Sequence, residues 1–129
     1  MNKILVEVSV GELLDKISIL EIKKEKIKES EKLQFINDEY KVLKDQLDKN
    51  VKFDEKIDKL FQSLKEINAK LWIIEDDKRL CEKNSDFSEK FIKLSRDVHF
   101  LNDDRGKIKL EINHHAGSKI KEIKKYTNY

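Results

Sequence analysis

The 129-residue sequence contains no proline, three glycines and one cysteine. Proline and glycine are the residues that tight turns most often require, so their scarcity argues against an all-β fold. The lone cysteine, Cys81, excludes a disulfide bond within the chain and falls on an apolar helix face, which predicts a buried structural thiol. There is no signal-peptide pattern and no apolar run of about 18 residues. We therefore expect a soluble, cytoplasmic protein without a membrane span.

Several motifs of known chemistry are also missing. The sequence has no glycine-rich phosphate loop, no nucleophile elbow and no helix-turn-helix. His114 and His115 are adjacent and cannot share one helix face, which argues against a zinc site. The acidic residues in the middle of the chain are Glu75, Asp76, Glu82 and Asp86. Their spacing is not the Glu-x-x-Glu and Glu-x-x-Asp pattern of all-helical nucleotide pyrophosphatases, so we predict no metal and no cofactor and leave catalysis undecided.

The residues that are present predict packed helices. Charged residues make up 42% of the chain and hydrophobic residues 38%. Such a charge content would suit disorder, but the apolar residues recur at steps of three and four, as in amphipathic helices. We predict an all-α fold, an antiparallel bundle of about four main helices, two of them long. Residues 1–129 should form one domain, with an extended arm over 1–9 and a basic tail or short helix over 118–129.

Capping residues mark the expected helix ends. Ser9 begins a capping box, and the first helix should run to about residue 29. Ser30 and Asp54 should cap the second and third helices, and either Ser85 or Asp86 the fourth. Gly117 should end the fourth helix in the left-handed conformation. The β-branched residues 3–8 should be extended, packing along the bundle or pairing with another copy of the chain.

Charged and amide side chains interrupt the apolar stripes at three places. The interrupting residues are Glu21, Asn68, Glu75, Arg79, Asn102 and Arg105. Only three of the 28 basic residues are arginines, and two of these lie on inward faces. A guanidinium makes a two-pronged match to a carboxylate or phosphate that lysine cannot copy. We predict that these places meet inside the bundle.

Three interpretations of this predicted cluster remain open. In the first, the six residues form a buried ion-pair network that fixes the register of the helices, because an unpaired buried charge costs several kcal/mol. In the second, they bind an anionic small molecule through Arg79 and Arg105. In the third, they are partly exposed and have no role. The network predicts residues that are closed and mutually bonded, whereas the ligand site predicts a polar pocket open to solvent.

Charge is distributed unevenly along the chain. Residues 105–129 contain seven basic and two acidic residues, while the whole chain carries a net charge of +2. A basic end can attract nucleic acid or another polyanion, but lysines also suit the negative end of a helix dipole. Because no platform of aromatic and basic residues accompanies the charge, we do not expect nucleic acid to be the partner.

Three segments of the chain carry motifs that are specific in order and spacing. The first is Val6-Glu7-Val8-Ser9-Val10-Gly11-Glu12-Leu13-Leu14-Asp15-Lys16 with Ile19-Leu20-Glu21-Ile22-Lys23. It resembles the opening of a family of small helical bacterial and phage proteins of unknown function. The middle of the family resembles Leu71-Trp72-Ile73-Ile74-Glu75-Asp76 with Arg79, and its end resembles Asn102-Asp103-Asp104-Arg105 with Gly117-Ser118. Ile123 departs from the acidic residue that the family has there.

What the resemblance implies about function is limited. The family has no assigned activity, and its genes are associated with surface-polysaccharide assembly, which is not a mechanism. From the residues we predict a small helical binding or accessory protein, a homodimer or the partner of another protein. The alternative is a small enzyme or ligand sensor, and the resemblance implies a phosphorylated or nucleotide-sugar ligand for it.

Overall fold

The computed structural model describes residues 3–119 and 123, and within them it contains four helices and no strand. The helices are α1 (Val10–Lys26), α2 (Ser30–Asn50), α3 (Glu55–Lys83) and α4 (Glu89–Ala116). The predicted all-α fold with two long helices is confirmed. Most of the predicted C-terminal tail, residues 118–129, lies outside the described residues.

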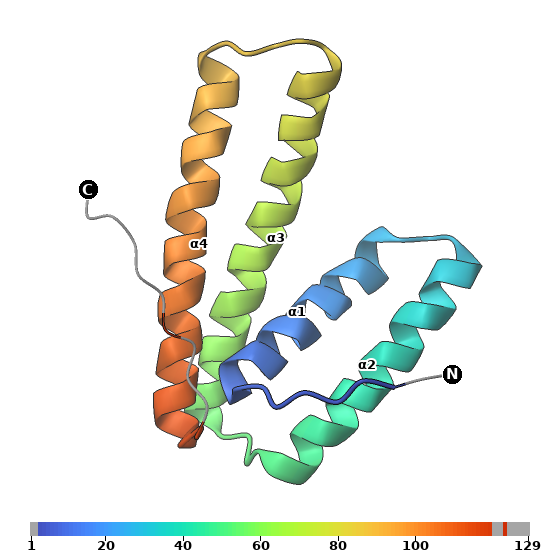
Figure 1. Cartoon of the computed structure of the whole chain (residues 1–129), viewed down its shortest axis with the longest axis vertical. Coiled ribbons are helices and arrows are strands. Elements are labelled where there is room, and N and C mark those ends of the chain that lie inside the picture. The colour runs from blue at the N-terminus through green and yellow to red at the C-terminus, as the bar shows by residue number, and fades with distance from the viewer. Residues whose placement is uncertain (1–2, 120–122, 124–129) are drawn as a thin grey trace.

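The helices form two antiparallel hairpins (Figure 1). α1 and α2 make the short hairpin, and α3 and α4 make the long hairpin. α1 packs against each of the other three helices and therefore joins the two hairpins. The long hairpin extends well past α1, so its distal half (residues 70–101, at the top of Figure 1) consists of two helices alone.

The hydrophobic core lies where the two hairpins meet. Its buried members are Leu13, Leu14, Ile17, Leu47, Ile57, Phe61, Leu64 and Ile112. They come from the first half of α1, the end of α2, the start of α3 and the end of α4, which gather at the base of Figure 1. Burying an aliphatic side chain contributes roughly 1.5–3 kcal/mol, so this junction supplies most of the stability.

Three predicted caps are present. The Ser9 hydroxyl accepts the amide of Glu12 at 3.0 Å, and the Asp54 carboxylate accepts the amide of Ile57 at 2.8 Å. Each cap satisfies an amide that has no partner within its helix. Gly117 ends α4 with φ +66°, a conformation that favours glycine.

Three predicted helix ends are wrong. α1 ends at Lys26, before residue 29, and Ser30 is the first residue of α2, behind an N-cap Glu29 that makes no side-chain capping bond. α4 starts at Glu89, later than Ser85 or Asp86 would allow. Ser85 has φ +54°, and the Asp86 carboxylate accepts the Ser88 amide at 3.1 Å. This local turn uses the acidic side chain, so Ser88 becomes the N-cap.

Candidate functional site

A row of polar groups lies in the contact between α1 and the long hairpin, and we call it the polar seam. Its members are Gly11, Glu12, Asp15, Ser18, Asn68, Asn102, Arg105, Lys109 and Asn113. Apart from the adjacent Gly11 and Glu12, the members on α1 are three or four residues apart, as are those on α4, so each set occupies one face of its helix.

Asp15 lies at the centre of the seam, with its side chain 2% exposed. Arg105 donates from Nε to Oδ1 at 2.9 Å and from Nη2 to Oδ2 at 2.5 Å. This is a bidentate guanidinium–carboxylate pair, the strongest geometry for such ions. Arg105 also donates from Nη1 to Asn102 Oδ1 at 3.3 Å, so each of its three guanidinium nitrogens contacts a protein side chain.

Asn68 ties α3 into the same pair. Its Nδ2 donates to Asp15 Oδ1 at 2.9 Å and lies 2.8 Å from Ser18 Oγ. The Ser18 hydroxyl in turn donates to the backbone oxygen of Asp15 at 2.8 Å. These buried polar groups satisfy one another, which avoids the penalty for an unmatched buried donor or acceptor.

The second ion pair of the seam lies one turn toward the start of α1. Lys109 Nζ is 2.7 Å from Glu12 Oε2, and the lysine side chain is 7% exposed. Next to it, Asn113 Oδ1 accepts the amide of Gly11 at 2.6 Å. Asn113 Nδ2 is buried and has no hydrogen-bond partner among the described residues. The first turn of α1 is therefore held by side chains of α4.

The pKa of Asp15 reflects these contacts. Burial acts to raise it, but the hydrogen bonds from Arg105 and Asn68 and the charges of Arg105 and Lys109 outweigh burial. The net pKa lies below the ordinary value of 3.8, so the carboxylate is ionised at neutral pH. An ionised acid bonded to an arginine is a structural anchor and a poor proton donor.

The structure brings together three of the six predicted site residues. Asn68 and Arg105 both bond Asp15, and Asn102 bonds Arg105. Glu21 lies in a separate cluster, where it contacts Lys65 Nζ at 3.2 Å and the Tyr40 hydroxyl at 3.4 Å. Burial acts to lower the pKa of Lys65, but the hydrogen bonds that its ammonium donates to Glu25 and Glu21 outweigh burial, so the net pKa is raised.

Glu75 and Arg79 do not join the seam. Both are exposed, and neither makes a hydrogen bond or ion pair with any other described residue. Glu75 lies two helical turns beyond Asn68, about 10 Å further along α3. α1 crosses only the proximal half of the long hairpin, so no other described helix covers that face. The prediction that all six residues meet is therefore wrong for Glu75 and Arg79.

The sequence reasoning missed Asp15, the partner of Arg105. A signal for it was available, because Gly11, Asp15, Ser18 and Ile22 recur at steps of four, three and four. This row lies beside the apolar stripe and consists of small or polar residues up to Ile22. Such a row on an inward face indicates a close, polar helix contact.

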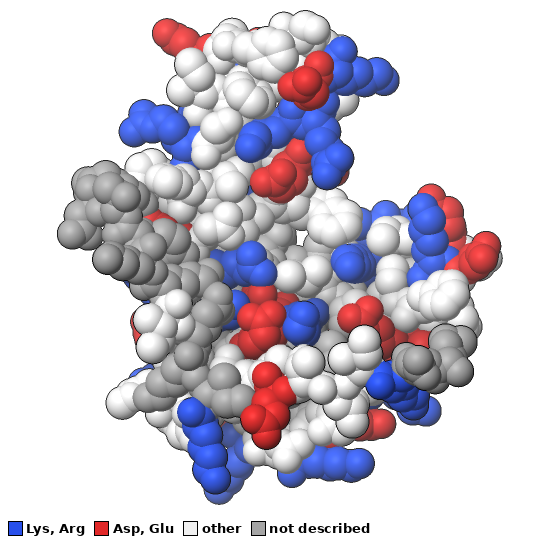
Figure 2. Space-filling view, in the orientation of Figure 1, with Lys and Arg blue, Asp and Glu red and all other residues white. Residues whose placement is uncertain are grey.

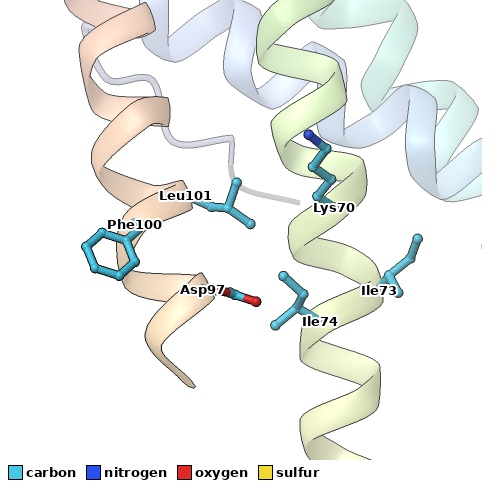
Figure 3. Close-up of a pocket in the computed structure, with 6 residues that line it drawn as sticks. All are labelled: Lys70, Ile73, Ile74, Asp97, Phe100 and Leu101. Carbon is cyan, nitrogen blue, oxygen red and sulfur yellow. The ribbon is translucent and has the colours of Figure 1, made fainter. Parts of the chain in front are cut away.

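Two shallow hollows lie on the distal half of the long hairpin. The first, of about 390 Å³, is lined by Lys70, Ile73, Ile74, Asp97, Phe100 and Leu101. In Figure 3, Ile74, Asp97 and Leu101 point into the space between the helices, and Ile73 and Phe100 point away on opposite sides. The second hollow, of about 490 Å³, is lined by Glu89, Ile92, Lys93, Arg96, Asp97 and Phe100. Asp97 and Phe100 belong to both, so the hollows are neighbours, and the second is lined by α4 alone.

The surface carries mixed charge. On the face seen in Figure 2, lysine and arginine side chains alternate with acidic ones, and neither sign dominates a large area.

None of the four helices combines the length and apolar character needed to cross a bilayer. Within residues 3–119 and 123, no group of three or more histidine, cysteine or acidic side chains is arranged to hold a metal ion.

Comparison with known proteins gives one result. A protein-family model described as "Family of unknown function (DUF6165)" matches residues 4–129. No curated protein and no solved structure matches the chain.

Proposed function

We propose that this chain, which belongs to DUF6165, a family of unknown function, is a small helical accessory protein. Its distal long hairpin holds an amphipathic helix of a partner protein. The observation that carries this proposal is the apolar surface of that hairpin. Ile73, Leu80, Phe87, Ile92 and Phe100 are each 43–55% exposed. Ile73 on α3 and Phe100 on α4 line the first hollow, one on each helix, and exposed apolar side chains of this kind mark an interaction site in a folded protein.

The shape of this surface suits a helix. Two antiparallel helices leave a shallow channel, and its floor is the apolar pair Ile74 and Leu101 (Figure 3). Partner helices commonly place apolar side chains, spaced three or four residues apart, into such a channel. The 390 Å³ hollow is large enough for one or two anchoring side chains, which usually carry most of the binding energy.

The rim of the channel specifies the charge of the partner. Its charged lining is Lys70 and Asp97, and the neighbouring hollow adds the basic Lys93 and Arg96 and the acidic Glu89. The ammonium of Lys93 is already 2.7 Å from Asp97. A partner helix with acidic residues beside its apolar stripe would face Lys70 and Arg96 with opposite charge, which favours association and sets its orientation.

The polar seam supports a scaffold role more than the ligand alternative. A phosphorylated or nucleotide-sugar ligand would need the guanidinium of Arg105. That guanidinium bonds Asp15 and Asn102, and the Asp15 side chain is 2% exposed. Binding an anion there would displace a bonded, buried carboxylate, at a cost of several kcal/mol. We also propose a cytoplasmic location, in keeping with a lone, buried cysteine.

The test is a selection of helical peptides on the intact protein. A displayed library of 16-residue peptides, about 24 Å long when helical, would be selected for binding to the wild-type chain. The binders would then be measured against Ile73→Asp and against the matched control Val42→Asp. Val42 is 59% exposed on α2, away from the channel. We expect selected peptides to carry an apolar stripe with acidic flanks, to bind the control variant, and to lose at least tenfold in affinity for Ile73→Asp.

Two outcomes would overturn the proposal. One is a set of peptides without helical periodicity, and the other is equal binding to Ile73→Asp and wild type. The ligand alternative has its own test, thermal unfolding with a panel of nucleotide sugars and sugar phosphates. A ligand at about 100 times its dissociation constant adds about 2.7 kcal/mol, which raises the melting temperature visibly. A saturable rise would replace the accessory role with the ligand alternative.

A further inference from the structure

The N-terminal arm, residues 3–8, places several apolar side chains in solvent. Ile4, Leu5 and Val6 are 86%, 91% and 73% exposed. β-Branched and apolar residues in sequence favour an extended strand. The arm then enters the bundle at Ser9, which is 3% exposed and caps α1. A strand-forming segment is therefore held at one end by a rigid helix.

The backbone of the arm is unpaired. None of the amides and carbonyls of residues 3–8 makes a hydrogen bond to another part of the described chain. An extended segment with free backbone groups and apolar side chains is a template for pairing with another strand. No strand is present within residues 3–119 and 123, so no described segment pairs with the arm.

We propose that residues 3–7 pair in antiparallel with the same residues of a second copy, with the two-fold axis at Leu5. The sequence Lys3-Ile4-Leu5-Val6-Glu7 is complementary to itself in this register. Lys3 faces Glu7 of the second copy, and Glu7 faces its Lys3. Ile4 faces Val6, and Leu5 faces Leu5. Opposite charges and apolar pairs placed directly across two strands each contribute roughly 0.2–1 kcal/mol.

The neighbouring registers lack this match. A shift by one residue in one direction places Glu7 opposite Ile4, and in the other it places Lys3 opposite Val6. Either shift separates the two charges and moves the side chains of one strand to the other face of the ribbon. The register centred on Leu5 is the one that pairs both charges.

The proposed dimer does not rest on partner binding at the long hairpin, because the arm and the channel are different surfaces. A two-stranded ribbon alone is marginally stable in water, so the dimer should dissociate on dilution. Symmetric pairing of one surface with itself also closes the assembly at two copies.

The test is a charge exchange measured by sedimentation equilibrium of the full chain. The wild type should behave as a dimer that dissociates on dilution. Lys3→Glu places two acidic side chains opposite each other in both pairs, and Glu7→Lys does the same with two basic ones. We expect each single variant to weaken the dimer at least tenfold, and the double variant Lys3→Glu/Glu7→Lys to restore it. Lys28→Glu, an exposed lysine outside the arm, is the control and should not change the mass.

Cross-linking tests the register directly. Leu5→Cys should form a disulfide-linked dimer under mild oxidation, because residues directly opposite have Cβ atoms about 4.5–5.5 Å apart. Val6→Cys should cross-link far less, since the two thiols are then diagonal. Cys81 is buried and should not cross-link in the wild type.

The outcomes separate this inference from the proposed function. A monomeric wild type, single charge variants that dimerise as well as wild type, or a double variant that stays monomeric would each overturn the pairing. Equal cross-linking at the two positions would overturn the register. Ile73→Asp should leave the dimer intact, so a loss of peptide binding in that variant reports on the hairpin alone.

Discussion

At the scale of single residues, the pair formed by Asp15 and Arg105 joins α1 to the long hairpin. The carboxylate is buried, and its hydrogen bonds come from two other helices. A buried ion pair adds little net stability compared with apolar residues of the same shape, but removing one partner strands the other. The pair therefore acts mainly on specificity, by fixing how α1 sits on the long hairpin.

We expect Arg105→Met to lower the free energy of unfolding by roughly 3–5 kcal/mol at pH 7, because it leaves the Asp15 carboxylate buried without its guanidinium. Urea denaturation followed by circular dichroism would measure the loss. The control is Lys93→Met, which breaks the exposed pair with Asp97 and should cost less than about 1 kcal/mol. An Arg105→Met protein as stable as the control variant would contradict the structural role of the seam.

The pKa of Asp15 predicts a pH dependence. Its folded-state pKa lies below the ordinary value of 3.8, so the folded form holds the proton more weakly than the unfolded chain does. The stability from this group is therefore present above about pH 4 and is lost as the pH falls through the folded-state pKa. We expect the stability advantage of wild type over Asp15→Asn to shrink between pH 5 and pH 2. Parallel curves of unfolding free energy against pH for the two proteins would contradict this.

At the scale of elements, the structure depends on how closely α1 approaches α4. Gly11 lies where a Cβ atom would be 2.6 Å from the backbone oxygen of Lys109 and 2.9 Å from Asn113 Oδ1. The backbone oxygen of Lys109 cannot move aside as the end of a flexible side chain can. A glycine here permits the hydrogen bond between the Gly11 amide and Asn113 at 2.6 Å.

We expect Gly11→Ala to destabilise the fold by about 1–3 kcal/mol through overpacking, although alanine normally favours a helix. The measurement is again urea denaturation, combined with amide chemical shifts along α4. The shifts should change at residues 109–113 and not at the distal end. Gly117→Ala is the comparison, because a Cβ there meets nothing within 4 Å and its cost comes only from φ +66°. A Gly11→Ala protein more stable than wild type would contradict the close approach.

At the scale of the whole molecule, stability is unevenly distributed. The core lies at the junction of the hairpins, whereas the distal half of the long hairpin has only two helices to bury its apolar residues. Regions with few buried contacts open locally at a lower free energy than the whole fold. If the arms also pair, a dimer presents two such hairpins, and a partner with two helices gains by avidity.

The lone thiol reports on this local opening. Cys81 is 3% exposed near the distal end of α3. We expect it to react with a thiol reagent at a rate set by local opening of the hairpin, faster than global unfolding allows. Arg105→Met, which lowers global stability at the junction, should then leave the labelling rate almost unchanged. A labelling rate that rises in proportion to the loss of global stability would show that Cys81 is exposed only by complete unfolding.

The sequence alone determined the elements of this protein. Apolar residues at steps of three and four, with almost no glycine and no proline, specify four helices whatever their arrangement, because helical periodicity is a local property. Ser9, Asp54 and Gly117 were predictable as caps for the same reason. The helix starts near Ser30 and Asp86 were not predictable, because several polar residues compete for each cap. Small differences in local hydrogen bonding then determine which residue becomes the N-cap.

Only the tertiary structure decided which charges meet. Periodicity assigns Arg105, Glu75 and Arg79 to similar faces, but it does not say how far along the long hairpin α1 reaches. α1 crosses the proximal half, so Arg105 is buried against Asp15 while Glu75 and Arg79 remain exposed. The crossing point depends on the fit of Gly11 against Lys109 and on the apolar core, which are contacts between residues about 100 positions apart. A local pattern carries no information about such distances in space.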